Sequence, residues 1–178
     1  MQCLLKYSLI SLLALVLSQH SYAFEREAIR LDTAKSSITI EVELAITPAE
    51  RKQGLMGRDD FGPGDAMLFI YPGEQRLSFW MKGTPVSLDI IFFDGKGAWL
   101  NTAYSTIPFS LDSYSSVAPG RYVLEVAAGE AKRLGIGEGT LLLGKAGAMR
   151  TSFFSVEGAR FLCPATGSAS SVRVESTL

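Results

Sequence analysis

The sequence predicts a mainly β domain of the α+β class, arranged as a small antiparallel β-barrel or sandwich with two short helices. Short apolar or alternating segments recur along the chain, and Gly and Pro separate them at short intervals. Only two segments carry the signals of a helix start or a helix end. Many short strands with few helices are typical of an antiparallel sheet that closes on itself or packs on a second sheet.

The N-terminal residues 1–23 have the layout of a secretory signal peptide. Lys6 precedes the apolar run Leu9 to Leu17, and the small residues Ser21 and Ala23 suit cleavage after Ala23. The apolar run is shorter than the ~20 residues of a transmembrane helix. We therefore expect a periplasmic or secreted protein, with a retained N-terminal anchor as the alternative.

Cleavage would remove the only histidine, His20, and one of the two cysteines, Cys3. The remaining 155 residues have no imidazole, which excludes Ser-His-Asp and Cys-His catalysis and histidine zinc sites. Cys163 has no partner for an internal disulfide and is expected to be a bystander thiol or to pair between molecules. Sixteen basic and 18 acidic residues remain, so the charge predicts neither nucleic-acid binding nor contact with an anionic membrane.

The clearest strand is predicted from Ser36 to Ile46, where apolar residues alternate with polar ones. A short helix should follow to about Leu55, because Thr47 can cap its N-terminus, Pro48 suits its first turn and Glu50 completes a capping box. The apolar face of the strand consists of Ile38, Ile40, Val42, Leu44 and Ile46.

Further elements follow from Gly and Pro punctuation and from apolar runs. We predict turns at residues 72–74 and 94–97, a long loop at 106–120 and a second helix at 129–134. The remaining strands are predicted at residues 66–71, 77–81, 88–93, 98–105, 122–127 and 141–143.

These elements define a β domain over residues 36–144. A lead-in at 24–35 precedes it, and a C-terminal extension at 145–178 follows it. The extension is predicted to contain a hairpin at 153–162 and a Ser- and Thr-rich, disordered end from residue 166.

Seven short runs of the chain form a distinctive set: Gly54–Arg58, Ala66–Phe69, Phe79–Pro85, Leu88–Phe92, Tyr122–Val126, Ala128–Gly129 and Leu134–Ile136. Together they closely resemble the DUF192 (UPF0127) family of small, often secreted, uncharacterised proteins. The resemblance covers residues 36–144 and implies a compact, mostly β domain without an established activity. It also implies that Asn is frequent where this chain has Gly83 and Ala127, so both side-chain amides are missing here.

Four charged residues from these runs form the first candidate site. Two cations and two carboxylates that meet at one end of the domain can hold a carboxylate, sugar or phosphate ligand, or shift one another's pKa for acid–base work. The competing interpretation is a structural ion pair in which Lys82 and Asp89 brace the turn between them. The four residues are Arg58, Lys82, Asp89 and Glu125.

Aromatic and sulfur-containing side chains supply the other candidates. Tyr104 and Tyr114 lie at or in the long loop and are better ligand candidates than aromatic residues that serve the core. Thioethers are soft ligands for Cu(I), although methionine is also an ordinary core residue. The aromatic candidates for lining a groove are Phe79, Trp80, Tyr71, Tyr104, Tyr114 and Tyr122, and the copper candidates are Met56, Met67 and Met81.

The leading functional hypothesis is a binding module for a small polar ligand or an envelope partner, without a cofactor. Its site would be the turn at 82–87 with the neighbouring charges and the long loop. One alternative is a small hydrolase or lyase with Asp89 or Glu125 as base and Lys82 or Arg58 as electrostatic stabiliser. Another is an envelope scaffold protein. The candidate ligand-binding residues are Arg58, Lys82, Thr84, Asp89, Tyr114 and Glu125.

Overall fold

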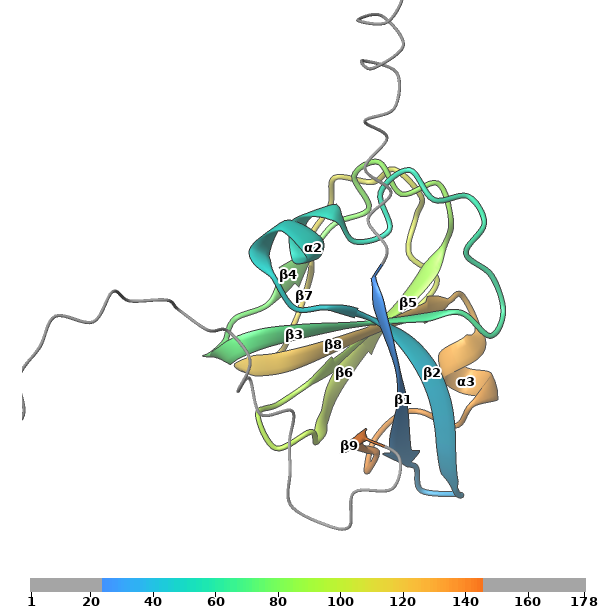
Figure 1. The fold of residues 1–178 in the computed structure, drawn as a ribbon, viewed down its shortest axis with the longest axis vertical. Coiled ribbons are helices and arrows are strands. Elements are labelled where there is room, and N and C mark those ends of the chain that lie inside the picture. Colours follow the sequence, from blue (N-terminus) through green and yellow to red (C-terminus); the bar gives the residue numbers. More distant parts are fainter. Residues whose placement is uncertain (1–23, 146–178) are drawn as a thin grey trace, which may run out of the picture.

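A seven-stranded mixed sheet forms the body of the protein in the computed structural model, which describes residues 24–145 (Figure 1). Its strand order is β6-β5-β8-β3-β2-β1-β9, in which β2 and β3 are parallel and all other neighbours are antiparallel. Its strands are β1 (Glu25–Asp32), β2 (Ser37–Ala45), β3 (Ala66–Gln75), β5 (Leu88–Phe93), β6 (Trp99–Ala103), β8 (Gly120–Ala127) and β9 (Leu141–Lys145).

A second sheet and two helices complete the described part of the chain. The small sheet pairs β4 (Ser78–Phe79) with β7 (Tyr114–Ser115), and the helices are α2 (Pro48–Gln53) and α3 (Glu130–Arg133). The predicted mainly β class with two short helices is therefore confirmed. No helix within residues 24–145 is long and apolar enough to cross a membrane.

The large sheet curls until its two edges touch at one end. A single bridge pairs Ala98, beside β6, with Leu141 of β9, and the Leu142 amide donates to the Gly97 carbonyl at 2.7 Å. Within the described residues no continuous ladder joins β6 to β9. The sheet is strongly curved but is not a closed barrel.

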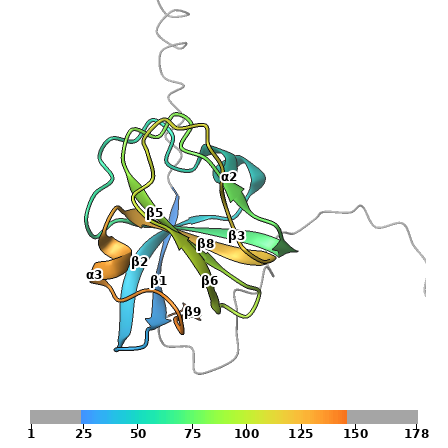
Figure 2. The ribbon, with the colours of Figure 1, turned by 180° about the vertical axis from the view of Figure 1, so that it is seen from behind.

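The central strands β5, β8 and β3 are buried on both faces of the sheet. The core is therefore divided into two clusters, one on each face. Alternate residues of β3 belong to different clusters: Leu68 and Ile70 to the first, Met67 and Phe69 to the second. Figures 1 and 2 show α3 and β9 on one side of these strands, and α2 with β4 and β7 on the other. The first cluster includes Ala131 of α3, and the second includes Leu55, just after α2.

The first helix starts as the sequence predicts. The Glu50 amide donates to the Thr47 hydroxyl at 3.2 Å, and the Thr47 amide donates to the Glu50 carboxylate at 2.8 Å, which completes the capping box. Strand β2 also follows the prediction. Val42 and Leu44 are buried in the first core cluster, and Ile38, Ile40 and Ile46 pack against it.

The sheet is not wholly antiparallel as predicted, because β2 and β3 are parallel. The strand predicted at 77–81 is only Ser78–Phe79, and the loop predicted at 106–120 contains β7. Two further differences lie in the large sheet. Residues 24–35, predicted as a lead-in, contribute β1, which pairs with β2 and β9. The predicted turn at 72–74 is wrong, because β3 continues to Gln75. Its pairing with β8 is interrupted between Ile70 and Gln75, so Pro72 lies where no ladder hydrogen bond is required of it. The signal peptide, the hairpin at 153–162, the end of the chain and Cys163 lie outside the described residues.

Candidate ligand-binding site

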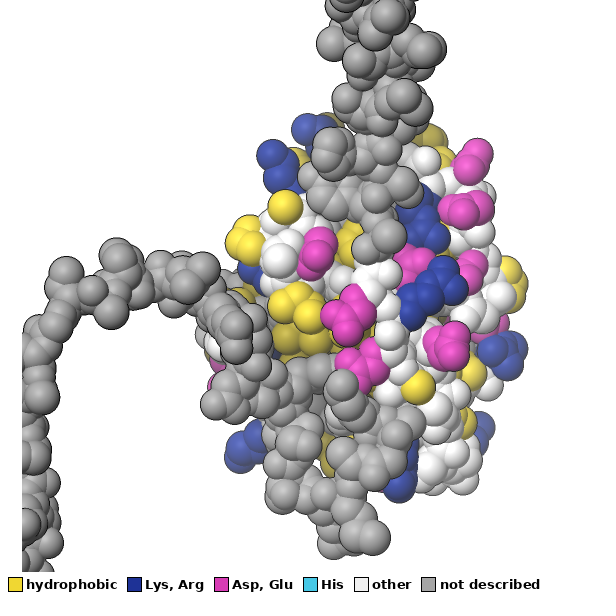
Figure 3. All heavy atoms as spheres, viewed as in Figure 1, with side chains coloured by type: hydrophobic (Ala, Val, Ile, Leu, Met, Phe, Trp, Pro, Cys, Tyr) yellow, Lys and Arg dark blue, Asp and Glu magenta, His cyan; other side chains and the backbone are white. Residues whose placement is uncertain are grey.

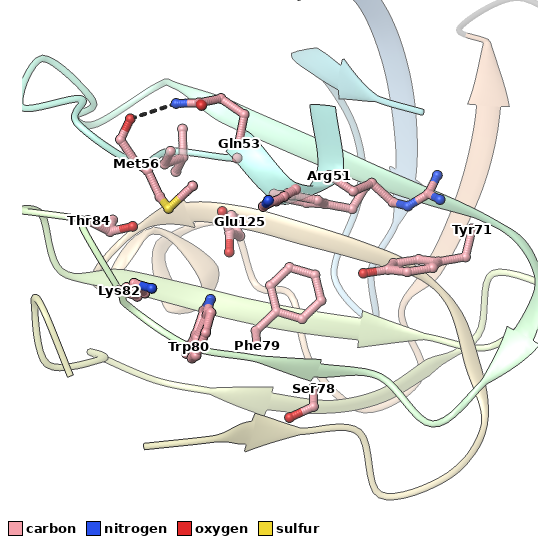
Figure 4. A pocket seen from close by; sticks show the side chains of 14 residues that line it. Arg51, Gln53, Met56, Tyr71, Ser78, Phe79, Trp80, Lys82, Thr84 and Glu125 are labelled. Carbon is pink, nitrogen blue, oxygen red and sulfur yellow. Dashed lines mark hydrogen bonds between the residues drawn. The ribbon is translucent and has the colours of Figure 1, made fainter. Parts of the chain in front are cut away.

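A pocket of about 200 Å³ opens between α2, the start of the small sheet and the face of the large sheet that carries the second core cluster (Figure 4). Backbone and apolar atoms supply much of its wall, and a few polar side chains converge on it. This composition is typical of small-molecule sites. The lining residues are Arg51, Lys52, Gln53, Gly54, Leu55, Met56, Phe69, Tyr71, Ser78, Phe79, Trp80, Lys82, Thr84 and Glu125.

Glu125 lies in the middle of this pocket, with Met56, Lys82, Trp80 and Phe79 around it (Figure 4). It belongs to the central strand β8, where its neighbours across the ladder are Met67 on β3 and Ile90 on β5. Both neighbours are apolar and fully buried. The sheet therefore places a carboxyl group on an apolar floor that α2 and the small sheet surround.

The Glu125 side chain is only 5% exposed, and its carboxyl group makes no hydrogen bond or ion pair with any residue between 24 and 145. Burial raises the pKa of this carboxyl to about 8, because the charged form loses its hydration. At neutral pH most Glu125 side chains therefore carry a proton. The group can then donate a hydrogen bond into the pocket as well as accept one.

Aromatic rings form one wall of the pocket. The rings of Phe69 and Phe79 meet edge to face, with centroids 5.0 Å apart and planes at 89°. Trp80 is 55% exposed, and the Lys82 ammonium lies 5.2 Å from its ring centroid. A large exposed aromatic side chain beside a pocket contributes little to the core, so its contact surface is available to a ligand.

A tight turn places Lys82 at the pocket. The Thr84 amide donates to the Met81 carbonyl at 3.0 Å, and Gly83 occupies the third position of the turn with a φ of +69°. Turns of this kind favour Gly or Asn at that position. The Asn that the sequence resemblance implies for other proteins at position 83 would therefore fit the same backbone, so a structural role explains it without a ligand. The Gly57 amide donates to the Gly83 carbonyl at 2.8 Å, which ties the turn to the segment after α2.

The pocket lining has three basic side chains and one acidic side chain, and the basic side chains differ in whether structural partners hold them. Arg51 donates to the carbonyl oxygens of Ile46 and Ile70 and lies over the Tyr71 ring, so the fold holds its guanidinium in place. Lys52 and Lys82 make no salt bridge among the described residues. Glu125 is the only acidic residue of the lining.

Asp89, a predicted site residue, lies elsewhere. Its carboxylate is fully buried and accepts hydrogen bonds from the amides of Ser105 at 2.9 Å, Gly129 at 2.9 Å and Ala131 at 3.1 Å. Ser105 and Gly129 both have positive φ, at +50° and +89°. Asp89 therefore fixes two unusual backbone positions. It makes no ion pair with Lys82, so the proposed brace across the turn is not formed.

Arg58 and Tyr114 also have structural partners outside the pocket. The Arg58 guanidinium forms an ion pair with Glu43 of β2, and its Nε lies 3.3 Å from Oδ1 of Asp60. The Tyr114 hydroxyl accepts a hydrogen bond from the Ile107 amide at 3.1 Å, which ties the long loop to the small sheet. Of the six candidate ligand-binding residues, the pocket lining includes three: Lys82, Thr84 and Glu125.

The methionines do not share one environment. Met56 lines the pocket, Met67 is fully buried in the core, and the Met81 sulfur accepts a hydrogen bond from the Thr106 hydroxyl at 3.3 Å. Between residues 24 and 145, no group of three or more His, Cys, Asp or Glu side chains is placed to hold a metal ion.

The sequence did not single out the polar residues that α2 contributes to the pocket, Arg51, Lys52 and Gln53. The capping box predicts the helix, but it does not say which part of the sheet the helix will cover. Phe79, Trp80 and Tyr71, predicted as candidates for lining a groove, do line the pocket.

Comparison with known proteins places the chain among uncharacterised proteins. The model of the DUF192 family, described as an uncharacterized ACR, matches residues 29–143. A crystal structure from Sinorhizobium meliloti 1021, described as a candidate transcription regulator, shares 36% identity over 68% of this chain and 95% of its own, with a TM-score of 0.65. A crystal structure of a protein of unknown function from Novosphingobium aromaticivorans DSM 12444 shares 29% identity with this chain. The match covers 70% of this chain and 89% of the other, also with a TM-score of 0.65. None of the curated proteins matches this chain.

Proposed function

The chain belongs to the DUF192 family of uncharacterised proteins, and for this member we propose the binding of a small polar ligand in the pocket around Glu125. The pocket combines an apolar floor, an aromatic wall and a few polar groups that can fix the orientation of a ligand. The long side chains of Lys52 and Lys82 have no ion-pair partner there among the described residues.

One observation carries the proposal: the carboxyl group of Glu125 is buried, faces the pocket and has no hydrogen-bond partner among the described residues. Burial of a polar group without a partner costs about 1–3 kcal/mol, and most buried polar groups in proteins are paired. A residue that served stability alone would be better replaced by a hydrophobic one at this position. A ligand that supplies the missing hydrogen bond explains the carboxyl group.

A second candidate is acid–base catalysis by the same residue. A general acid or base works best when its pKa lies near the operating pH, and the Glu125 pKa of about 8 satisfies this condition. Lys82 would then stabilise the negative charge that develops on the substrate. Neither Asp89 nor Arg58 would take part, because both are occupied by structural partners.

We further propose export to the periplasm or the exterior, on the strength of the signal-like residues 1–23. An envelope partner is supported by apolar side chains of the long loop that are 62–68% exposed: Ile107, Phe109, Leu111 and Val117. Such side chains can mark an interaction surface. Figure 3 gives no support for nucleic-acid binding, because acidic and basic side chains are interspersed on the face that it shows.

Thermal-shift screening of the purified protein tests ligand binding in this pocket. The panel should contain anionic, neutral and cationic fragments of one-ring size. We expect at least one class to raise the melting temperature of the wild type, and Trp80→Ala to reduce that shift.

Tyr104→Ala is the matched control. Tyr104 is also an exposed aromatic residue beside a lysine, with the Lys132 ammonium 4.9 Å from its ring centroid, but it does not line the pocket. If no fragment class raises the melting temperature, or if both variants respond alike to a fragment that does, ligand binding at this pocket is the wrong function.

A further inference from the structure

We propose that the pocket binds a small one-ring carboxylate, whose anionic group accepts a hydrogen bond from Glu125 and lies beside Lys82. This inference rests on the proposed function, because it names the ligand class for the same site. Three features of the pocket support it: the sign of the surrounding charge, the donor capacity of Glu125, and the size and aromatic character of the cavity.

The net charge of the pocket lining favours an anion. Arg51 and Lys52 come from α2, and Lys82 comes from the turn after β4. Tyr71 on β3 is the other titratable group of the lining, and burial raises its pKa, so it stays neutral at physiological pH. On the floor, the ladder neighbours of Glu125 are apolar. With Glu125 protonated, the lining has no negative charge. Of its three cations, the Arg51 guanidinium is already held by two carbonyl oxygens, so Lys52 and Lys82 are the charges open to an anion.

The proton on Glu125 decides between an anionic and a cationic ligand. A protonated carboxyl group donates a strong, short hydrogen bond to a carboxylate oxygen. An ionised Glu125 would repel that oxygen and would favour an ammonium group instead. The ammonium group would then have to lie near Lys82 and Lys52, so a cation is disfavoured by the same residues that favour an anion.

The cavity sets the size of the rest of the ligand. Its volume of about 200 Å³ exceeds the ~150 Å³ of an engineered apolar cavity that holds benzene. The extra space suits one polar substituent on a ring. Phe79, Trp80 and Tyr71 present aromatic surface to this space, which can contact a ring edge to face or with offset stacking.

Isothermal titration with benzoate, benzamide and benzylamine tests the ligand class, because the three probes share one ring and differ in charge. For the wild type we expect benzoate to bind at least tenfold more tightly than benzamide at pH 7, and benzylamine not to bind. The dissociation constant for benzoate should be nearly constant below pH 7 and should rise about tenfold per pH unit above pH 8, as Glu125 loses its proton.

Two variants assign the effect to residues. Glu125→Gln keeps an N–H donor but cannot ionise, so its dissociation constant for benzoate should no longer change with pH. Lys82→Met should weaken benzoate binding about tenfold. Lys132→Met, which removes a lysine beside the exposed Tyr104 outside the pocket, should leave it unchanged. Circular dichroism of each variant verifies that the fold is intact.

Other outcomes overturn the carboxylate class and leave the proposed function standing. Tighter binding of benzylamine that strengthens with pH and disappears in Glu125→Gln would identify a cationic ligand. Equal affinities for benzoate and benzamide would show that the charge is irrelevant. If none of the three probes binds, the carboxylate class is wrong, whereas the proposed function falls only if the wider fragment panel also fails.

Discussion

Asp89 and Glu125 are both buried carboxyl residues on adjacent central strands, but they lie on opposite faces of the sheet. Asp89 accepts hydrogen bonds from three backbone amides on the face that α3 covers. Glu125 accepts none from the described residues on the face that carries the pocket. Burial alone therefore does not distinguish the two carboxyl groups. They differ in their hydrogen-bond partners, which give Asp89 a structural role and make Glu125 the candidate for a ligand-binding role.

Strand register explains why Asp89 and Glu125 lie on opposite faces of the sheet. In the β5–β8 ladder, Asp89 is opposite Val126, and Ile90 is opposite Glu125. Residues opposite each other share a face, and successive residues alternate between faces. Asp89 and Glu125 are offset by one position, so the sheet separates them although they are close in space.

The largest expected effect comes from removing the structural acid. Asp89→Ala would leave three backbone amides without their acceptor and should lower the free energy of unfolding by about 5 kcal/mol. Asp89→Asn, which keeps one carbonyl oxygen, should cost less. Urea denaturation measures both values. A loss below about 1 kcal/mol for Asp89→Ala would contradict the structural role.

Removal of the Glu125 carboxyl group should have the opposite effect on stability. Below about pH 4.5 Glu125 is protonated in the folded and unfolded states alike. Between pH 4.5 and pH 8 only the unfolded state ionises, so the wild-type free energy of unfolding should fall as the pH rises, by on the order of 5 kcal/mol from this group. Glu125→Gln should abolish this contribution and be more stable than the wild type at pH 8.

Denaturation of both proteins from pH 4 to pH 9 measures that contribution as the difference between them. Other carboxyl groups cancel in this difference, including Glu130, whose pKa the hydrogen bond from Arg133 lowers. Equal pH profiles would mean that Glu125 is not neutral in the folded protein, which would weaken the contrast with Asp89.

The turn that positions Lys82 should have an intermediate effect. Gly83→Val forces a β-branched residue to a φ of +69° and should lower the free energy of unfolding by about 1–2 kcal/mol. Gly83→Asn should cost less than half as much, because Asn tolerates this conformation. Thermal denaturation compares the two variants. Equal losses of stability in the two variants would show that the positive φ at position 83 is not the cause.

The smallest effect on stability is expected at the exposed wall of the pocket. Trp80→Ala should change the free energy of unfolding by less than about 0.5 kcal/mol, because Trp80 is 55% exposed. The same variant should weaken ligand binding. Urea denaturation and fragment titration on the same preparation measure the two effects. A large loss of stability would place Trp80 with Asp89 as a structural residue.

Local sequence patterns predicted most of the fold. The alternation in β2, the apolar run of β5 and the capping box of α2 depend on neighbouring residues, and all three are present. Strand β1 was missed because Ile29 and Leu31 are its only large aliphatic residues, and its pairing with β2 and β9 decides its conformation. Such pairing is not visible in a local pattern.

The site was harder to predict than the fold for the same reason. Lys82 and Thr84 come from one motif run and Glu125 comes from another, and the pocket brings the two runs together. Asp89 comes from an equally distinctive run, but strand register places it on the other face. The motifs identified all three residues and Asp89, whereas only the strand register shows which of them face the pocket.

The pairing of β1 with β9 has a consequence for biogenesis. These are the first and last strands of the described domain, and they lie side by side in the sheet. As the chain is synthesised, β1 can pair with β2 early, but its other edge stays open until β9 has been made. An open strand edge is prone to aggregation, so we expect the nascent domain to aggregate most readily before its last strand is made. The same adjacency means that a short linker between the two strands should yield a circularly permuted protein with the same sheet.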